Sequence, residues 1–383
     1  MTNFPADLDP ALYGSGATTG PFIIWGGSAI LRDYSPLGAQ VYYSGGHESA
    51  AGLPNIQLSL VCDFSSLTWA VRNLPSAPNA SGSFSPETGL AADGTPYCPH
   101  SYLGLQEMPA AWGGSPKGSL VSFFWAGSSF VNRVNLIDVS QPAKGYTQLA
   151  TTQPQNVAPN RISFRANGYS NGVYPVTVQD RTRNGWWLAT NGEVDFTLFL
   201  SKSGKITQYP AVNGNGQDGC LVLCDSLNLL MFIDGGYDAG VYASNAYRTV
   251  RVRNLLTDAV SSFQALGTIP WSGVGYAGGS DRNYHGPQKM GLQWVEDLKA
   301  IYGLDETTEP PTLVKLSPPA SDPATNAWAW SAVPVKHWPA DADGQQVLQR
   351  AQNNVWSKFR YVESLKAFVY CTAANRRPQV IRI

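Results

Sequence analysis

One turn-and-strand pattern recurs six times along this chain, and it constrains the fold more than any other feature of the sequence. In each copy a tight polar turn separates two short apolar runs, and the turns are centred near residues 36, 116, 183, 226, 297 and 364. Two apolar runs joined by a tight turn predict a β-hairpin. The chain is therefore predicted to contain six hairpins, spread over its whole length.

Each predicted hairpin is followed by two further short strands. The clearest case is the run 56–63, which ends in an Asp and is followed by the run 68–74. The turn phrase is closest in sequence in the copies at 34–46, 224–236, 295–305 and 362–371, and looser at 115–127 and 180–190. Each copy is thus predicted to be a four-stranded antiparallel meander.

A radial array of four-stranded sheets is a β-propeller. We expect an all-β, six-bladed propeller in one domain spanning 1–383, with an N-terminal arm at about 1–20 and inserted loops at about 75–97 and 305–325. The last copy ends after three strands, so we expect the apolar run 22–26 to supply its fourth strand and close the ring. A pair of β-sandwiches is the alternative, although sandwiches need no repeated turn phrase.

Several short motifs carry a resemblance to a known family. They are Gly45-Gly46-His47, Asp63 followed by Thr68-Trp69, Pro99-His100-Ser101-Tyr102, and Asp234-Gly235-Gly236. Together they resemble Kelch-type propellers, and the chain looks most like divergent Kelch-like proteins encoded by bacteria and their phages. The resemblance spans nearly the whole chain. It implies a propeller with its ligand site on one rim, and a role in protein interaction is common among such domains.

Composition excludes several classes of partner. Only 14% of the residues are charged and the formal net charge is −1, whereas soluble domains carry about 25% charged residues. A nucleic-acid partner is therefore not expected, because there is no basic field to hold a phosphate backbone. No apolar run approaches the roughly 18 residues of a membrane span, and the N-terminus lacks the pattern of a signal peptide. We expect cytoplasmic synthesis, which is compatible with a place in a virion.

The five cysteines form no metal-binding or redox motif. Four of them, all but Cys98, lie within apolar runs, so we expect reduced core thiols and no disulfide. The copper site of galactose-oxidase-type relatives needs a Tyr–Cys crosslink, and only Cys98 lies in a loop beside a candidate Tyr. No metal and no other cofactor is expected.

The four histidines share one position in the predicted repeat. The end of strand two, the start of strand three, the end of strand four and the start of the next first strand all lie at one edge of a meander. Every histidine follows an even-numbered strand or precedes a first strand. The residues predicted to bind a ligand on this rim are His47, His100, Tyr169, Tyr237, Arg282, His285 and His337. The alternative interpretation is that His47 and His100 only cap blades through hydrogen bonds to the backbone.

Three functional classes stay open from the sequence. The first is a non-enzymatic recognition or structural propeller, such as a phage tail adhesin or decoration protein that binds a host glycan or another virion protein. Few charges and 44 aromatic residues, among them the loop candidates Trp112, Trp328 and Trp330, suit sugar stacking. Assembly as a homo-oligomer or within a virion is compatible with this class.

The second class is a polysaccharide lyase, and the third is an intracellular protein-interaction platform. A lyase needs a base beside a uronate carboxylate and a cation that neutralises it. The side chains that would serve are His285, Tyr284, Arg282, His100 and Tyr102. Since the nearest carboxylate to His285 in sequence is Asp281, too little orients the imidazole ring, and binding without turnover is the expectation.

Overall fold

The structure is a computed structural model. It describes residues 26–43, 59–73, 90, 94, 96, 101–124, 133–141, 145–154, 162–164, 175–190, 195–212, 219–235, 237–238, 241–242, 248–268, 290–305, 312–333, 335, 355–371 and 378–383. These residues belong to two compact units. Unit 1 holds the strands up to residue 210 and unit 2 holds the strands from residue 220 onward.

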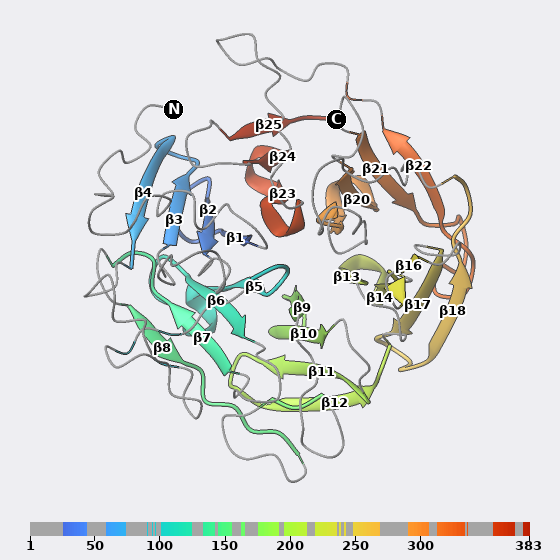
Figure 1. The fold of residues 1–383 in the computed structure, drawn as a ribbon, viewed down its shortest axis with the longest axis horizontal. Coiled ribbons are helices and arrows are strands. Elements are labelled where there is room, and N and C mark those ends of the chain that lie inside the picture. The colour runs from blue at the N-terminus through green and yellow to red at the C-terminus, as the bar shows by residue number, and fades with distance from the viewer. Residues whose placement is uncertain are drawn as a thin grey trace. The chain divides into compact units, whose positions relative to one another are not determined.

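Unit 1 contains three four-stranded antiparallel sheets, each built from consecutive strands (Figure 1). Blade 1 consists of β1 (Gly27–Leu31), β2 (Ala39–Tyr43), β3 (Ser59–Asp63) and β4 (Thr68–Arg72). Blade 2 consists of β5 (Leu105–Met108), β6 (Ser119–Phe124), β7 (Arg133–Ile137) and β8 (Tyr146–Gln148). Blade 3 consists of β9 (Pro175–Asp180), β10 (Gly185–Thr190), β11 (Phe196–Ser201) and β12 (Ile206–Pro210). The first strands pack side by side, β1 against β5 and β5 against β9.

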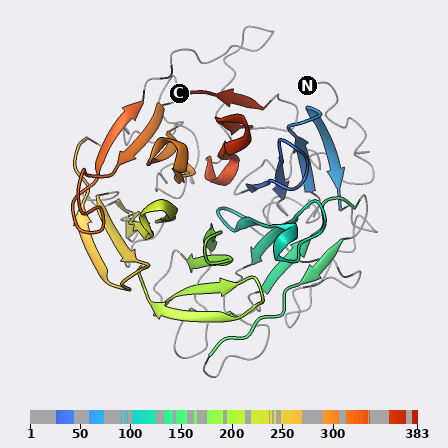
Figure 2. The same ribbon diagram turned by 180° about the vertical axis from the view of Figure 1, so that it is seen from behind.

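Unit 2 repeats the arrangement, as the view from behind also shows (Figure 2). Blade 4 consists of β13 (Cys220–Cys224), β14 (Leu229–Ile233), β17 (Thr249–Asn254) and β18 (Val260–Gln264), with the small hairpin β15 (Tyr237–Asp238) and β16 (Val241–Tyr242) inserted. Blade 5 consists of β19 (Gln293–Val295), β20 (Ala300–Asp305), β21 (Thr312–Ser317) and β22 (Ala329–Val333). The described part of blade 6 has three strands, β23 (Phe359–Val362), β24 (Ala367–Tyr370) and β25 (Gln379–Ile381).

This all-β arrangement of six antiparallel blades is that of a six-bladed β-propeller, which confirms the predicted fold class. The only helices among the described residues are short 3-10 turns, and none is long and apolar enough to cross a membrane. The sheets are sequential meanders, so the pair of sandwiches is set aside.

All six predicted turn phrases join the first two strands of a blade. In blades 3 to 6 the turns have the same length and occupy 181–184, 225–228, 296–299 and 363–366. The residue before the second strand has a positive φ in every blade: Gly38 (80°), Gly118 (73°), Asn184 (55°), Asn228 (53°), Lys299 (49°) and Lys366 (50°). Since this left-handed region favours Gly and Asn, four of these six positions carry the residue types that the turn prefers.

One prediction about the connections is wrong. The segment 305–325, expected to be an inserted loop, contains β21, which pairs with both β20 and β22. The segment 75–97 lies outside the described residues apart from positions 90, 94 and 96, and the arm 1–20 and the run 22–25 lie outside them entirely. The closing strand therefore stays a prediction.

The core consists of apolar side chains packed between neighbouring sheets. Blades 1 and 2 bury a cluster around Val41 and Leu120, blades 2 and 3 one around Trp186, and blades 5 and 6 one around Phe359. Two of the loop aromatics considered for sugar stacking belong to the core instead, because Trp328 is 0% and Trp330 is 5% exposed.

The described cysteines are buried in the core, as predicted: Cys62, Cys220, Cys224 and Cys371. Burial raises the pKa of the Cys220 thiol to about 12. A buried thiol with a raised pKa is a poor nucleophile and a poor metal ligand. Within the described ranges, no three His, Cys, Asp or Glu side chains come together in a group that could hold a metal ion.

Candidate functional site

The two ends of each blade differ in the length of their connections. At one end, here called the turn end, strands 1–2 and 3–4 are joined by short segments such as 181–184 and 202–205. At the other, the loop end, strand 2 is joined to strand 3 and each blade to the next. The loop-end connections include 73–104, 149–174 and 265–292. Because binding residues concentrate on long connections held by a rigid scaffold, the loop end is the candidate functional face of each blade.

The predicted site residues belong, by their place in the sequence, to loop-end connections. Most of them lie outside the described residues: His47, His100, Tyr169, Arg282, Tyr284, His285 and His337. Tyr237 has its backbone in β15, and its side chain is likewise outside the described part. Each histidine follows an even-numbered strand of its blade or precedes a first strand, as the sequence analysis expects. His47 follows β2, His100 precedes β5, His285 precedes β19 and His337 follows β22. A shared rim for these side chains stays a prediction.

Tyr102 is the one predicted site residue whose side chain is described, and it is buried. It is 3% exposed and has φ 37°, an unusual backbone conformation for an aromatic residue. Its neighbours connect blades: the Gly27 amide donates to Ser101 Oγ at 2.6 Å, and Thr177 Oγ1 donates to the Leu103 carbonyl at 2.7 Å. In this structure Tyr102 therefore belongs to a segment that connects β1, β5 and β9.

Buried hydroxyl groups gather at the loop end of blade 1. Ser28 and Tyr43 lie on paired strands and are 0% exposed, and Ser59, opposite Tyr43 in the sheet, is 0% exposed as well. Ser59 Oγ has no hydrogen-bond partner among the described residues. Buried hydroxyl groups normally find a partner. The loop-end termini of β1, β2 and β3 therefore carry buried hydroxyl groups.

Unit 2 has charged side chains in the corresponding place. Asp305 ends β20 and is 2% exposed, and Lys358, directly before β23, is 0% exposed. Lys and Asp are rarely fully buried, so these two residues are candidates for a specific role. The sequence analysis missed them because it looked only at histidines and aromatic residues when it selected positions after an even-numbered strand or before a first strand. The same rule applied to every charged residue would have selected both.

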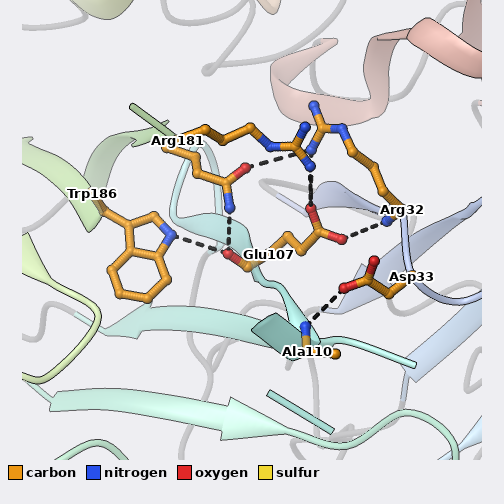
Figure 3. Close-up of polar contacts among 7 residues, drawn as sticks. Arg32, Asp33, Glu107, Ala110, Arg181 and Trp186 are labelled. Carbon is orange, nitrogen blue, oxygen red and sulfur yellow. Dashed lines mark hydrogen bonds and ion pairs between the residues drawn. The ribbon is translucent and has the colours of Figure 1, made fainter. Parts of the chain in front are cut away.

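The turn end, by contrast, is occupied by contacts between blades. In unit 1, Glu107 of β5 is buried and its carboxylate lies between two arginines from the neighbouring blades (Figure 3). It accepts hydrogen bonds from the Arg32 amide (2.5 Å), from Arg32 Nη1 (3.0 Å) and from Arg181 Nη2 (3.4 Å). The backbone carbonyl of Glu107 accepts a further bond from Trp186 Nε1 at 3.1 Å. This cluster joins blades 1, 2 and 3.

Polar contacts, one of them an ion pair, join neighbouring blades at the turn end of unit 2. Lys366 Nζ and the Tyr361 hydroxyl each donate to Asp297 Oδ2 at 2.8 Å, and Lys299 Nζ donates to Ser226 Oγ at 3.2 Å. The bonds from Lys366 and then Tyr361 lower the pKa of Asp297. Burial, together with the bond to Asp297, raises the pKa of Tyr361 to about 12. These groups contribute contacts between neighbouring blades of unit 2.

The comparisons with known proteins find likenesses of fold. No family model matches the sequence, and no curated protein matches it. Among solved structures, a catalytically inactive virginiamycin B lyase from Staphylococcus aureus with quinupristin is similar at a TM-score of 0.38 and 10% identity, over 94% of this chain and 85% of that one.

Two further solved structures are similar, one of a glycoside hydrolase and one of another lyase. An engineered GH43 glycoside hydrolase is similar at a TM-score of 0.39 and 10% identity, over 86% of this chain and 55% of that one. A streptogramin B lyase is similar at a TM-score of 0.38 and 11% identity, over 93% of this chain and 82% of that one. With identities this low, none of these activities is transferred to this chain.

Proposed function

We propose that this protein is a non-enzymatic recognition propeller whose loop end binds a glycan or another protein. The observation that carries the proposal is the contrast between the two ends of the blades. Short turns and contacts between blades occupy the turn end, while the loop end combines long connections with buried polar residues such as Ser59 and Asp305. A chain with 14% charged residues and 44 aromatic residues suits neutral polar ligands better than charged ones.

The most concrete form of this proposal is a phage virion protein, either a tail adhesin or a decoration protein. It rests on the resemblance to phage-encoded Kelch-like proteins and on the low charge of the chain. Mass spectrometry of purified virions tests this part. Presence of the chain in stoichiometric amounts supports it, and absence from virions of a phage that encodes it would overturn the virion role while leaving recognition open.

A glycan array probed with the full-length protein tests recognition itself. We expect binding to at least one glycan class, lost in His285→Ala. The control is Glu296→Gln, which changes a half-exposed carboxylate at the turn end of blade 5 and should leave binding intact. Equal loss in both variants, or no binding to glycans or to virion proteins, would contradict the proposal.

A polysaccharide lyase is the second candidate, and one observation favours it. The left-handed backbone of Tyr102 directly follows the His100-Ser101 pair, and strained backbone is concentrated at active sites. Incubation with uronate-containing polysaccharides, followed by ultraviolet absorbance of new unsaturated ends, separates the two functions. Turnover that disappears in His285→Ala would replace binding by catalysis.

A further inference from the structure

An open cavity of about 450 Å³ lies at the turn end of blade 2. One wall comes from the connection between β5 and β6, with Gly113, Gly114 and Ser115. The other wall comes from Leu136 of β7, Thr147 of β8 and Asp138, which directly follows β7. Ligand-binding cavities in proteins span about 300–1,000 Å³, so its size suits a small ligand.

The first wall of the cavity comes from residues added before the turn that joins the first two strands of blade 2. Blades 1 and 2 share a Ser-Pro-x-Gly turn, at 35–38 and 115–118, closed by the same 2.8 Å bond from the Gly amide to the Ser carbonyl. In blade 2 the segment 109–114 precedes this turn and contains the 3-10 helix η3 (Ala110–Trp112). Gly114 folds back so closely that a Cβ there would lie 2.2 Å from the Met108 carbonyl oxygen. The extra residues therefore form a wall that requires glycine.

Asp138 supplies the charged group of the cavity. Its Oδ1 accepts bonds from the Ser140 amide (3.0 Å) and hydroxyl (2.6 Å), whereas the bond that Oδ2 accepts from Gln141 is longer, at 3.4 Å. Partial burial alone would raise the pKa of Asp138, but hydrogen bonds from Ser140, Gln141 and Ser115 outweigh it and lower the pKa. At neutral pH the side chain is a carboxylate, and Oδ2 can accept further hydrogen bonds.

The chemistry of the lining selects the class of ligand. Among the described residues that line the cavity, Asp138 carries a charge and none is Lys, Arg or His, so this part of the lining offers an anionic ligand a carboxylate and no compensating cation. The half-buried Leu136 offers an apolar contact, and Ser115 and Thr147 offer hydroxyl groups. A neutral sugar presents an apolar ring face and hydroxyl donors, which is the complement of this set.

We propose that this cavity is a second binding site, which takes a neutral sugar unit whose hydroxyl groups donate to Asp138 and whose ring packs on Leu136. It goes beyond the proposed function because it lies at the turn end of blade 2, opposite the loop end. A sugar bound here would leave the loop-end connections free for another ligand.

Two pairs of variants isolate the site. Asp138→Asn removes the charge, and its control is Asp63→Asn: Asp63 ends β3 and accepts matching bonds from Ser35 and Ser65 in blade 1. Thr147→Trp fills the cavity from an exposed position of β8, and Thr147→Ser is its conservative control. The two Asp variants should lose similar stability, so only binding should separate them.

The experiment titrates the full-length protein with glucose, galactose, mannose, N-acetylglucosamine and their disaccharides, with glucuronate and glucosamine as charged comparisons, by saturation-transfer NMR and calorimetry. We expect at least one neutral sugar to bind, with affinity about tenfold lower in Asp138→Asn and lost in Thr147→Trp. Asp63→Asn and Thr147→Ser should bind as the parent does.

Absence of neutral sugar binding would overturn the inference. So would a preference for glucuronate or glucosamine over every neutral sugar, or binding that survives Thr147→Trp. Binding lost in His285→Ala and retained in Thr147→Trp would place the sugar at the loop end, which supports the proposed function and refutes this second site.

Discussion

Replacing Glu107 by Gln tests whether a buried carboxylate holds three blades together. The side chain is 1% exposed, while the arginines that contact it are partly exposed, Arg32 by 34% and Arg181 by 43%. Gln keeps the shape of the side chain and removes its charge. The variant therefore loses both ion pairs without opening a cavity.

The loss in the free energy of unfolding depends on whether the charges left without a partner stay buried. Breaking a fully buried ion pair costs about 3–5 kcal/mol, because one charge is left without a partner. After Glu107→Gln the charges left behind are arginines that can regain water, so the cost is smaller. A hydrogen bond to a charged group contributes about 1.5–3 kcal/mol, and the 3.4 Å bond from Arg181 is long. We expect the free energy of unfolding to fall by about 2 kcal/mol, in line with these terms.

Urea unfolding followed by tryptophan fluorescence and by far-ultraviolet circular dichroism measures this change. Trp186 bonds to the Glu107 backbone carbonyl, so its fluorescence reports on the cluster. The matched control is Glu296→Gln, whose side chain is 44% exposed and which we expect to cost less than about 0.5 kcal/mol. Equal stability of Glu107→Gln and the parent, or an equal loss in the control, would refute the reasoning.

Three further predictions concern single features of unit 2. Asn228→Val should cost about 1–2 kcal/mol because a β-branched residue resists positive φ, and Asn228→Gly should not destabilise; thermal unfolding of both variants checks this. Lys366→Met should raise the pKa of Asp297, measured by NMR titration of its carboxyl group. Because the folded-state pKa is lowered, the stability that Asp297 contributes is present above its unfolded-state pKa and is lost as pH falls through the folded value. Deleting 378–383 should abolish soluble expression, since it removes β25 and the buried Ile381 from the core.

The fold could be predicted from the sequence because the turns carry their own conformational requirement. Residues with positive φ precede every second strand, and Gly38, Gly118, Asn184 and Asn228 are types that adopt it readily. Lys299 and Lys366 are less typical, yet the surrounding turn phrase Glu-Asp/Ser-Leu-Lys-Ala is the same in blades 5 and 6. The repeated turn phrase therefore identified these turns even where Lys, which rarely adopts a positive φ, precedes the second strand.

The error at 305–325 came from proline. The expectation of a loop there rested on a segment rich in Gly, Pro and Ser, and its proline pairs Pro310-Pro311 and Pro318-Pro319 flank β21. Proline is excluded from the interior of a central strand, but it is compatible with the residues just outside one. The four prolines therefore lie just outside the six-residue strand β21 and mark its two ends.

The candidate site was predicted less completely. The position of a residue before or after a given strand assigns it to one end of a blade but does not say whether its side chain is buried. Trp328 lies in a connection by sequence and is 0% exposed, with its indole nitrogen bonded to the Pro323 carbonyl at 2.8 Å. Lys358 is also 0% exposed although lysine is rarely buried. Burial of both depends on the packing of neighbouring blades, which local sequence does not encode.

Comparison between blades separates structural contacts from candidate functional ones. Gln106 and Gln293 occupy matching places in β5 and β19, and each side chain bonds to the backbone of the next blade's first strand, at Thr177 and Phe359. A contact that recurs in this way is explained by the packing of blades.

Departures from the repeat need a different explanation. The other second strands end at Tyr43, Phe124, Thr190, Ile233 and Tyr370, none of which is charged. Among the second strands, β20 alone ends in a carboxylate, that of Asp305, and blade 2 carries the additional segment 109–114 that walls a cavity. Since neither feature is needed to build a blade, selection for the fold alone does not account for them, and they are the positions at which substitutions should alter binding before they alter stability.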